Sequence, residues 1–184
     1  MSSESHAQLA VVLIGHGAPA TDCPPQLIGE LMGLEWRQAH ASDGSHAHQL
    51  EGRAAELDAK IRDWPRQGGN DPYKAGLERL AEALRPLLPT GRLFIGYNEF
   101  CRPSTDEVIG QAIREGAARI LVIPSMLTPG GVHSEKDIPR SLERLRRQYP
   151  QVSIEYVWPF DLQQVATLLA AHVKRALTAP AHSA

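Results

Sequence analysis

Residues 9–17, with the sequence LAVVLIGHG, form an apolar run that ends in a glycine–histidine–glycine turn. A continuous run rich in Val, Leu and Ile is typical of a strand that is buried on both faces of a parallel sheet. The run is too short to cross a membrane. It also continues into Gly15-His16-Gly17 instead of a small-residue cleavage site, which argues against a signal peptide. We therefore expect a core strand over Leu9–Ile14 that delivers His16 to the end of a sheet.

Three further segments have the same character and are expected to be strands, namely Arg92–Tyr97, Arg119–Pro124 and Val152–Trp158. Helix-period segments alternate with them, and we expect helices at residues 72–87, 104–116, 134–149 and 162–177. A predicted capping box between Ser104 and Glu107 begins the second of these helices. This alternation predicts an α/β fold, a four-stranded parallel sheet with helices on both faces. At this length we expect a single domain over residues 1–184.

Residues 20–70 contain no convincing strand and are interpreted as an insertion after the first strand. Leu27–Arg37 and Leu50–Trp64 have helical character, and the segment 39–49 between them is rich in His, Ser and Gly. That segment contains His40, His46 and His48, which could collect a metal ion, although a solvated flexible loop is the favoured interpretation. The insertion could form a lid over the site.

The composition excludes several classes of protein. Hydrophobic residues make up 42% and charged residues 22% of the chain, as in globular proteins. The net charge is −2 and no basic stripe is present, so we expect no nucleic-acid partner. Two cysteines are too few for a disulfide framework and lack the spacing of a metal site. We therefore expect a cytoplasmic protein with no membrane segment.

Candidate functional residues fall at the carboxyl ends of the expected strands, where ligands collect in sheets of this kind. His16, Glu99 and His133 each follow a different strand. Two imidazoles and a carboxylate suit a divalent transition metal ion. Taken singly, each residue has a structural alternative: a tight turn for His16, a helix cap for Glu99 and an exposed glycine turn for His133. A histidine phosphatase is disfavoured because Gly15 stands where that class has an arginine.

The loop from Thr128 to His133 contains Gly130 and Gly131 and leads into an expected helix. Free N–H groups at a helix N-terminus favour anions, so a substrate with several carboxylates could bind beside His133. Arg102 could pair with such carboxylates as well.

In these motifs the chain resembles the sirohydrochlorin chelatase family, which includes short cobalt chelatases and siroheme ferrochelatases. The resemblance rests on four segments of the chain: residues 11–17, 99–104, 116–124 and 130–139. It implies a chelatase-like fold in which one lobe pairs with a second copy as a homodimer. The chain departs from the family in its long insertion and in having Ala18-Pro19 where many relatives have Ser-Arg.

The resemblance also implies an activity, the insertion of Co²⁺ or Fe²⁺, with Ni²⁺ as a further option, into sirohydrochlorin or a related tetrapyrrole. The metal ion is then a substrate, and no organic cofactor is expected. His16 and His133 correspond to the metal ligands, and Glu99 to an acidic position that would assist proton removal. Substrate contacts are expected from the following residues: Gly17, Arg102, Ser104, Thr128, Gly130 and Gly131.

Two other functions remain open at this point. A non-catalytic metal or tetrapyrrole carrier would use the same residues without turnover. A metal-dependent hydrolase would also use histidine and carboxylate, but the sequence has no further motif of the kind that those sites show.

Overall fold

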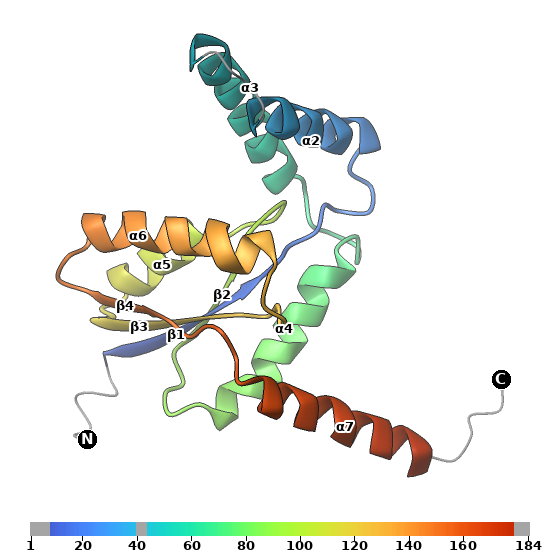
Figure 1. Cartoon of the computed structure of the whole chain (residues 1–184), viewed down its shortest axis with the longest axis vertical. Coiled ribbons are helices and arrows are strands. Elements are labelled where there is room, and N and C mark those ends of the chain that lie inside the picture. The colour runs from blue at the N-terminus through green and yellow to red at the C-terminus, as the bar shows by residue number, and fades with distance from the viewer. Residues whose placement is uncertain (1–7, 40–43, 179–184) are drawn as a thin grey trace.

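The computed structural model describes residues 8–39 and 44–178, which form an α/β fold around one parallel sheet (Figure 1). Within these residues the sheet has four strands in the order β2-β1-β3-β4. Their bounds are β1 Leu9–Gly15, β2 Leu93–Tyr97, β3 Arg119–Pro124 and β4 Ser153–Tyr156. The central strand β1 pairs in parallel with β2 and β3, and its burial on both faces explains its continuous apolar sequence. The predicted fold class is confirmed.

Helices cover both faces of the sheet. On one face lie α5 (Thr105–Arg114) and α6 (Ile138–Gln148), and α4 (Pro72–Leu84) lies on the other (Figure 1). The side chains of β1 alternate between the two, since Val12 and Ile14 pack with α5 and α6 and Leu13 packs with α4. Each fully buried aliphatic side chain of this kind contributes roughly 1.5–3 kcal/mol to folding.

The insertion forms two helices that project from the body of the molecule, α2 (Pro25–Ala39) and α3 (Gly44–Arg62) (Figure 1). They pack together around a separate apolar cluster made by Ala20, Cys23, Leu31, Leu34, Ala54, Leu57 and Ile61. His40 lies outside the described residues. The backbone of His46 and His48 belongs to α3, so the prediction of a loop there is wrong, because the helix begins at Gly44.

Two expected elements have different boundaries. The strand expected at 152–158 is shorter, because β4 ends at Tyr156. The helix expected from Ser134 begins instead with a π-helical turn, η2, over His133–Asp137, and continues as α6. The first residue of this turn is His133, one of the candidate metal ligands.

The last helix, α7 (Leu162–Thr178), extends away from the sheet (Figure 1). None of its residues is buried, and several large apolar side chains are more than half exposed: Leu162, Leu168, Leu169, Val173 and Leu177. Within residues 8–39 and 44–178, no helix is both long and apolar enough to cross a membrane.

Candidate metal centre

The carboxyl ends of the strands bring His16, Glu99 and His133 together. One ligand atom from each residue, an imidazole nitrogen or a carboxylate oxygen, lies within 4.8 Å of the other two. The two imidazole rings meet edge to face with their centroids 4.5 Å apart. All three residues are half-buried, so a ligand can reach them from solvent. The sequence expectation that these residues converge is met by this geometry.

Backbone hydrogen bonds fix His16 and Glu99 relative to each other. Beyond the ends of β1 and β2, Asn98 N–H donates to Gly15 O (2.9 Å) and Glu99 N–H donates to His16 O (2.8 Å). The turn after β1 also requires Gly17, whose φ of 92° favours glycine. His16 and Glu99 are therefore held side by side by main-chain contacts.

The surroundings of His16 determine its tautomer. Its Nδ1 lies 2.8 Å from the carbonyl oxygen of Gly17, which can only accept a hydrogen bond. In the neutral ring the proton is therefore on Nδ1, and Nε2 carries a free lone pair for a metal ion. The backbone N–H of His16 donates to the hydroxyl of Tyr73 (2.7 Å), which anchors the turn to α4.

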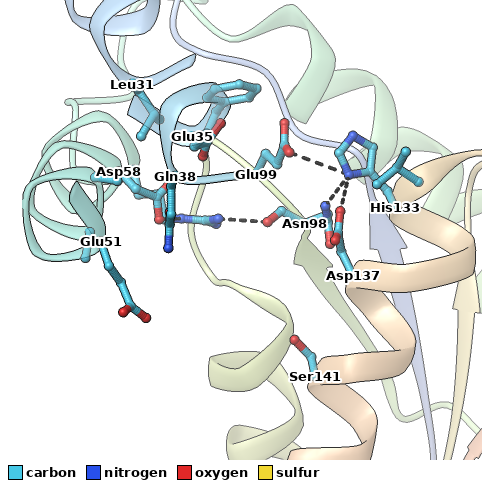
Figure 2. Close-up of a pocket in the computed structure, with 15 residues that line it drawn as sticks. Leu31, Glu35, Gln38, Glu51, Asp58, Asn98, Glu99, His133, Asp137 and Ser141 are labelled. Carbon is cyan, nitrogen blue, oxygen red and sulfur yellow. Dashed lines mark hydrogen bonds and ion pairs between the residues drawn. The ribbon is translucent and has the colours of Figure 1, made fainter. Parts of the chain in front are cut away.

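His133 is oriented by a carboxylate on the same helical turn. Its Nδ1 lies 2.8 Å from Asp137 Oδ2 and 3.5 Å from Glu99 Oε1, while Asn98 Nδ2 is 2.9 Å away (Figure 2). Each carboxylate can accept a hydrogen bond from Nδ1, whereas the amide nitrogen of Asn98 can only donate one to it. Both neutral tautomers therefore have a partner at Nδ1, and either leaves one ring nitrogen able to bind a metal ion. The sequence by itself indicates no role for Asp137 or Asn98. The signal for Asp137 was its position four residues after His133.

A cavity of about 540 Å³ opens beside these residues, between the end of the sheet and the insertion. Its acidic side chains come from both sides: Glu35, Glu51 and Asp58 from the insertion, Glu99 from the loop after β2 and Asp137 from the turn η2 (Figure 2). Arg62 is the only cationic side chain among its described lining residues. The pKa of Glu35 is raised from its ordinary value by burial and then by the charges of Glu99, Asp58 and Asp137. The cavity therefore favours cations.

The expected substrate-binding residues lie in three places. Gly17 lies in the turn that holds His16. Arg102 and Ser104 line a neighbouring cavity of about 360 Å³, where Arg102 pairs with the carboxylates of Asp63 and Glu107. Ser104 forms the predicted capping box with Glu107 at the start of α5.

The remaining three expected residues lie in the loop before His133. Thr128, Gly130 and Gly131 are exposed there, and none of them is among the described residues that line either cavity. The backbone N–H of Gly130 donates to Glu135 Oε1 (3.2 Å), so this loop is supported by the π-helical turn that follows it.

The donor set can bind a divalent transition metal ion. Two neutral imidazoles and one carboxylate suit Co²⁺, Fe²⁺, Ni²⁺ or Zn²⁺, and affinity alone does not choose between them. A site with three protein ligands leaves coordination positions for a second molecule that takes the ion.

The chain is similar to known proteins in sequence and in fold. A family model described as CbiX matches residues 68–177, which is more than half of the chain and includes Glu99 and His133. A sirohydrochlorin cobaltochelatase of Methanocaldococcus jannaschii is 41% identical over 78 residues, which cover 41% of this chain and 52% of that relative. A sirohydrochlorin ferrochelatase of Priestia megaterium is 30% identical over 66 residues, 36% of this chain and 24% of that relative.

The matched segments thus span about half or less of these two relatives. Among solved structures, a CbiX protein of cobalamin biosynthesis from Marinobacter aquaeolei VT8 superposes with a TM-score of 0.54. The two proteins are 20% identical, and the match covers 92% of this chain and 94% of the other, so this likeness supports the fold.

Proposed function

The chain belongs to the CbiX family, and on this premise we propose that it is a chelatase that inserts a divalent metal ion into sirohydrochlorin or a related tetrapyrrole. The observation that carries the proposal is the convergence of His16, Glu99 and His133 within 4.8 Å at the end of the sheet. The matched relatives are a cobaltochelatase and a ferrochelatase, so Co²⁺ and Fe²⁺ are the first metals to test, and Ni²⁺ the next.

The residues have distinct roles in this proposal. His16 holds the incoming ion through Nε2, since its Nδ1 faces a carbonyl oxygen, and His133 holds the ion through an imidazole nitrogen. Two pyrrole N–H protons leave the macrocycle as the ion enters, so one divalent cation is exchanged for two protons. Glu99 accepts one of these protons, because its carboxylate lies beside both imidazoles, and the other proton passes to solvent.

The negative charge of the cavity indicates different approaches for the two substrates, the metal ion and the tetrapyrrole. Glu35, Glu51 and Asp58 attract a cation on the side of the insertion and repel the carboxylates of a tetrapyrrole there. We therefore infer that the ion enters past the insertion. The carboxylates would then be bound by Gly17, Arg102, Ser104, Thr128, Gly130 and Gly131, the set expected from the resemblance. Of these, Arg102 must first release Asp63 or Glu107.

The proposal includes the assembly and location of the protein. We infer that one lobe, formed by residues 1–184, pairs with a second copy of the chain. The exposed apolar side chains of α7, which include Leu168, Leu169 and Val173, support this inference. The cytoplasmic location favoured by the cysteine usage is part of the same proposal.

The test is an anaerobic absorbance assay of metal insertion into sirohydrochlorin with Co²⁺, Fe²⁺ or Ni²⁺. We expect multiple turnovers by the wild type, loss of insertion in His16→Ala and His133→Ala, and no change in Gln164→Ala, a control at an exposed position of α7 away from its apolar face. Insertion no faster than the reaction without protein would reject the proposal. Binding of one equivalent without product would support the alternative, a metal or tetrapyrrole carrier.

A further inference from the structure

Arg62, at the end of α3, joins the insertion to the loop that carries Glu99. Its guanidinium donates through Nη2 to the carbonyl oxygen of Asn98 (2.7 Å) and through Nη1 to that of Cys101 (3.1 Å). The third guanidinium nitrogen, Nε, donates to Asp58 Oδ2 (2.7 Å). The side chain is only 13% exposed, so these bonds lie largely out of water.

The loop held by Arg62 forms one side of the metal centre. Residues 98–101 carry the carboxylate of Glu99 and the side-chain amide of Asn98, and both contact Nδ1 of His133. The backbone of the loop is strained, since Phe100 has a φ of 57°. A strained backbone persists only where surrounding contacts hold it, and Arg62 contributes two hydrogen bonds to the carbonyl oxygens of this loop.

We propose that Arg62 is a positioning residue for the metal centre, which acts by holding the loop 98–101 so that Glu99 and Asn98 reach His133. The inference deepens the proposed function, because it assigns the insertion a role at the same site. The insertion is then a support for the site in addition to any role as a lid.

The shape of arginine explains why this residue type is suited to the position. The planar guanidinium presents a fixed fork of donors that spans two carbonyl oxygens and a carboxylate at once. A lysine retains the positive charge as a single compact ammonium group, which cannot reproduce that fork. Arg62→Lys therefore removes the positioning while keeping the charge opposite Asp58.

Electrostatics and positioning predict opposite effects for an uncharged variant. If Arg62 acted only through its charge, Arg62→Met would strengthen Co²⁺ binding, because a cation is removed from an acidic cavity. If it positions the loop, the same variant binds Co²⁺ more weakly. The sign of the change therefore separates the two roles without any tetrapyrrole.

The experiment measures Co²⁺ affinity by anaerobic calorimetry for the full chain and for Arg62→Lys, Arg62→Met and Arg53→Met. Arg53 is a matched control on the same helix, since its side chain is 65% exposed and pairs with Glu30. We expect about a tenfold loss of affinity in both Arg62 variants and no change in Arg53→Met. In a Glu99→Gln background the effect of Arg62→Lys should shrink to less than about twofold, because the loop no longer delivers the carboxylate.

Thermal unfolding of each variant shows that the protein measured is folded. Wild-type affinity in folded Arg62→Lys, or an undiminished effect in the Glu99→Gln background, would overturn the inference, as would absence of Co²⁺ binding by the wild type. The Arg62 and Glu99 substitutions could show the expected coupling in Co²⁺ affinity while the wild type inserts no metal into sirohydrochlorin. That result would support the inference and reject the chelatase activity.

Discussion

A Cβ atom on residue 17 would lie 1.9 Å from the carbonyl oxygen of Glu99, so Gly17 and Glu99 form a backbone contact that has no room for a side chain. The contact lies within the candidate metal centre, because the N–H of Glu99 also donates to the carbonyl oxygen of His16. The turn after β1 and the loop after β2 are therefore a single packed unit.

Gly17→Ala is expected to displace the Glu99 loop and weaken Co²⁺ binding about tenfold. The added methyl group meets a carbonyl oxygen, and the positive φ of 92° adds backbone strain of about 1 kcal/mol or more. Calorimetry with Co²⁺ and thermal unfolding measure the two effects. Gly116→Ala is the matched control, because Gly116 has a φ of 87° but nothing within 4 Å of its Cβ position. Equal affinity losses in both variants would contradict the role of the contact.

Asp137→Asn is expected to lower Co²⁺ affinity by about 10–100-fold while the fold is retained. The carboxylate of Asp137 can only accept from Nδ1 of His133 and so opposes the Asn98 amide, which donates to the same atom. An amide at position 137 can add a second donor and favour the tautomer with the proton on Nε2, which blocks that nitrogen. Calorimetry again measures the change. Asp161→Asn is the control, because Asp161 accepts a hydrogen bond from Gln163 N–H at the start of α7. Unchanged affinity in Asp137→Asn would show that Nδ1 is oriented by other groups.

Much of this architecture could be predicted from local sequence patterns. The apolar run Leu9–Ile14 predicted β1 because a strand buried on both faces has no polar alternation. The capping box at Ser104 predicted the start of α5, since its contacts span only three residues. The convergence of His16 and Glu99 followed from the sheet, because parallel strands end at one edge.

Other features depend on contacts between distant residues or on geometry without a sequence signal. Arg62 bonds to Asn98 across 36 positions in the chain, and neither the insertion nor the loop indicates that pairing by itself. The π-helical turn at His133–Asp137 replaces the expected helical start, and the sequence does not distinguish it from an ordinary α-helical turn. The acidic cavity likewise combines side chains of the insertion with side chains that follow the strands, and the sequence does not indicate that they share one cavity.

Glu35→Gln is expected to raise the melting temperature at neutral pH. Because burial and neighbouring carboxylates raise the pKa of Glu35 above 4.5, the folded protein holds this proton more tightly than the unfolded chain does. Stability therefore falls as pH rises from 4.5 through the raised pKa, and the variant avoids that loss. Below pH 4.5 the two proteins should melt alike.

The measurement is calorimetric melting between pH 4 and 8, with Glu56→Gln on the exposed side of α3 as control. We expect Glu35→Gln also to bind Co²⁺ more weakly, because a negative charge is removed from the cavity. A gain in melting temperature that is the same at pH 4 and pH 7 would show that the carboxyl group is not the cause.

Leu169→Asp is expected to convert a dimer of the chain into a monomer. Leu169 and Val173 are each 57% exposed and lie four residues apart on one face of α7. Packing these apolar side chains against a second copy of the chain removes them from water, which favours the dimer. Light scattering after gel filtration measures the mass across a range of concentrations. Ala171→Asp is the matched control, because position 171 lies on the opposite side of α7 and is also exposed. A wild-type mass equal to that of one chain at all concentrations would reject the dimer, and a dimer unaffected by Leu169→Asp would place its interface away from this face of α7.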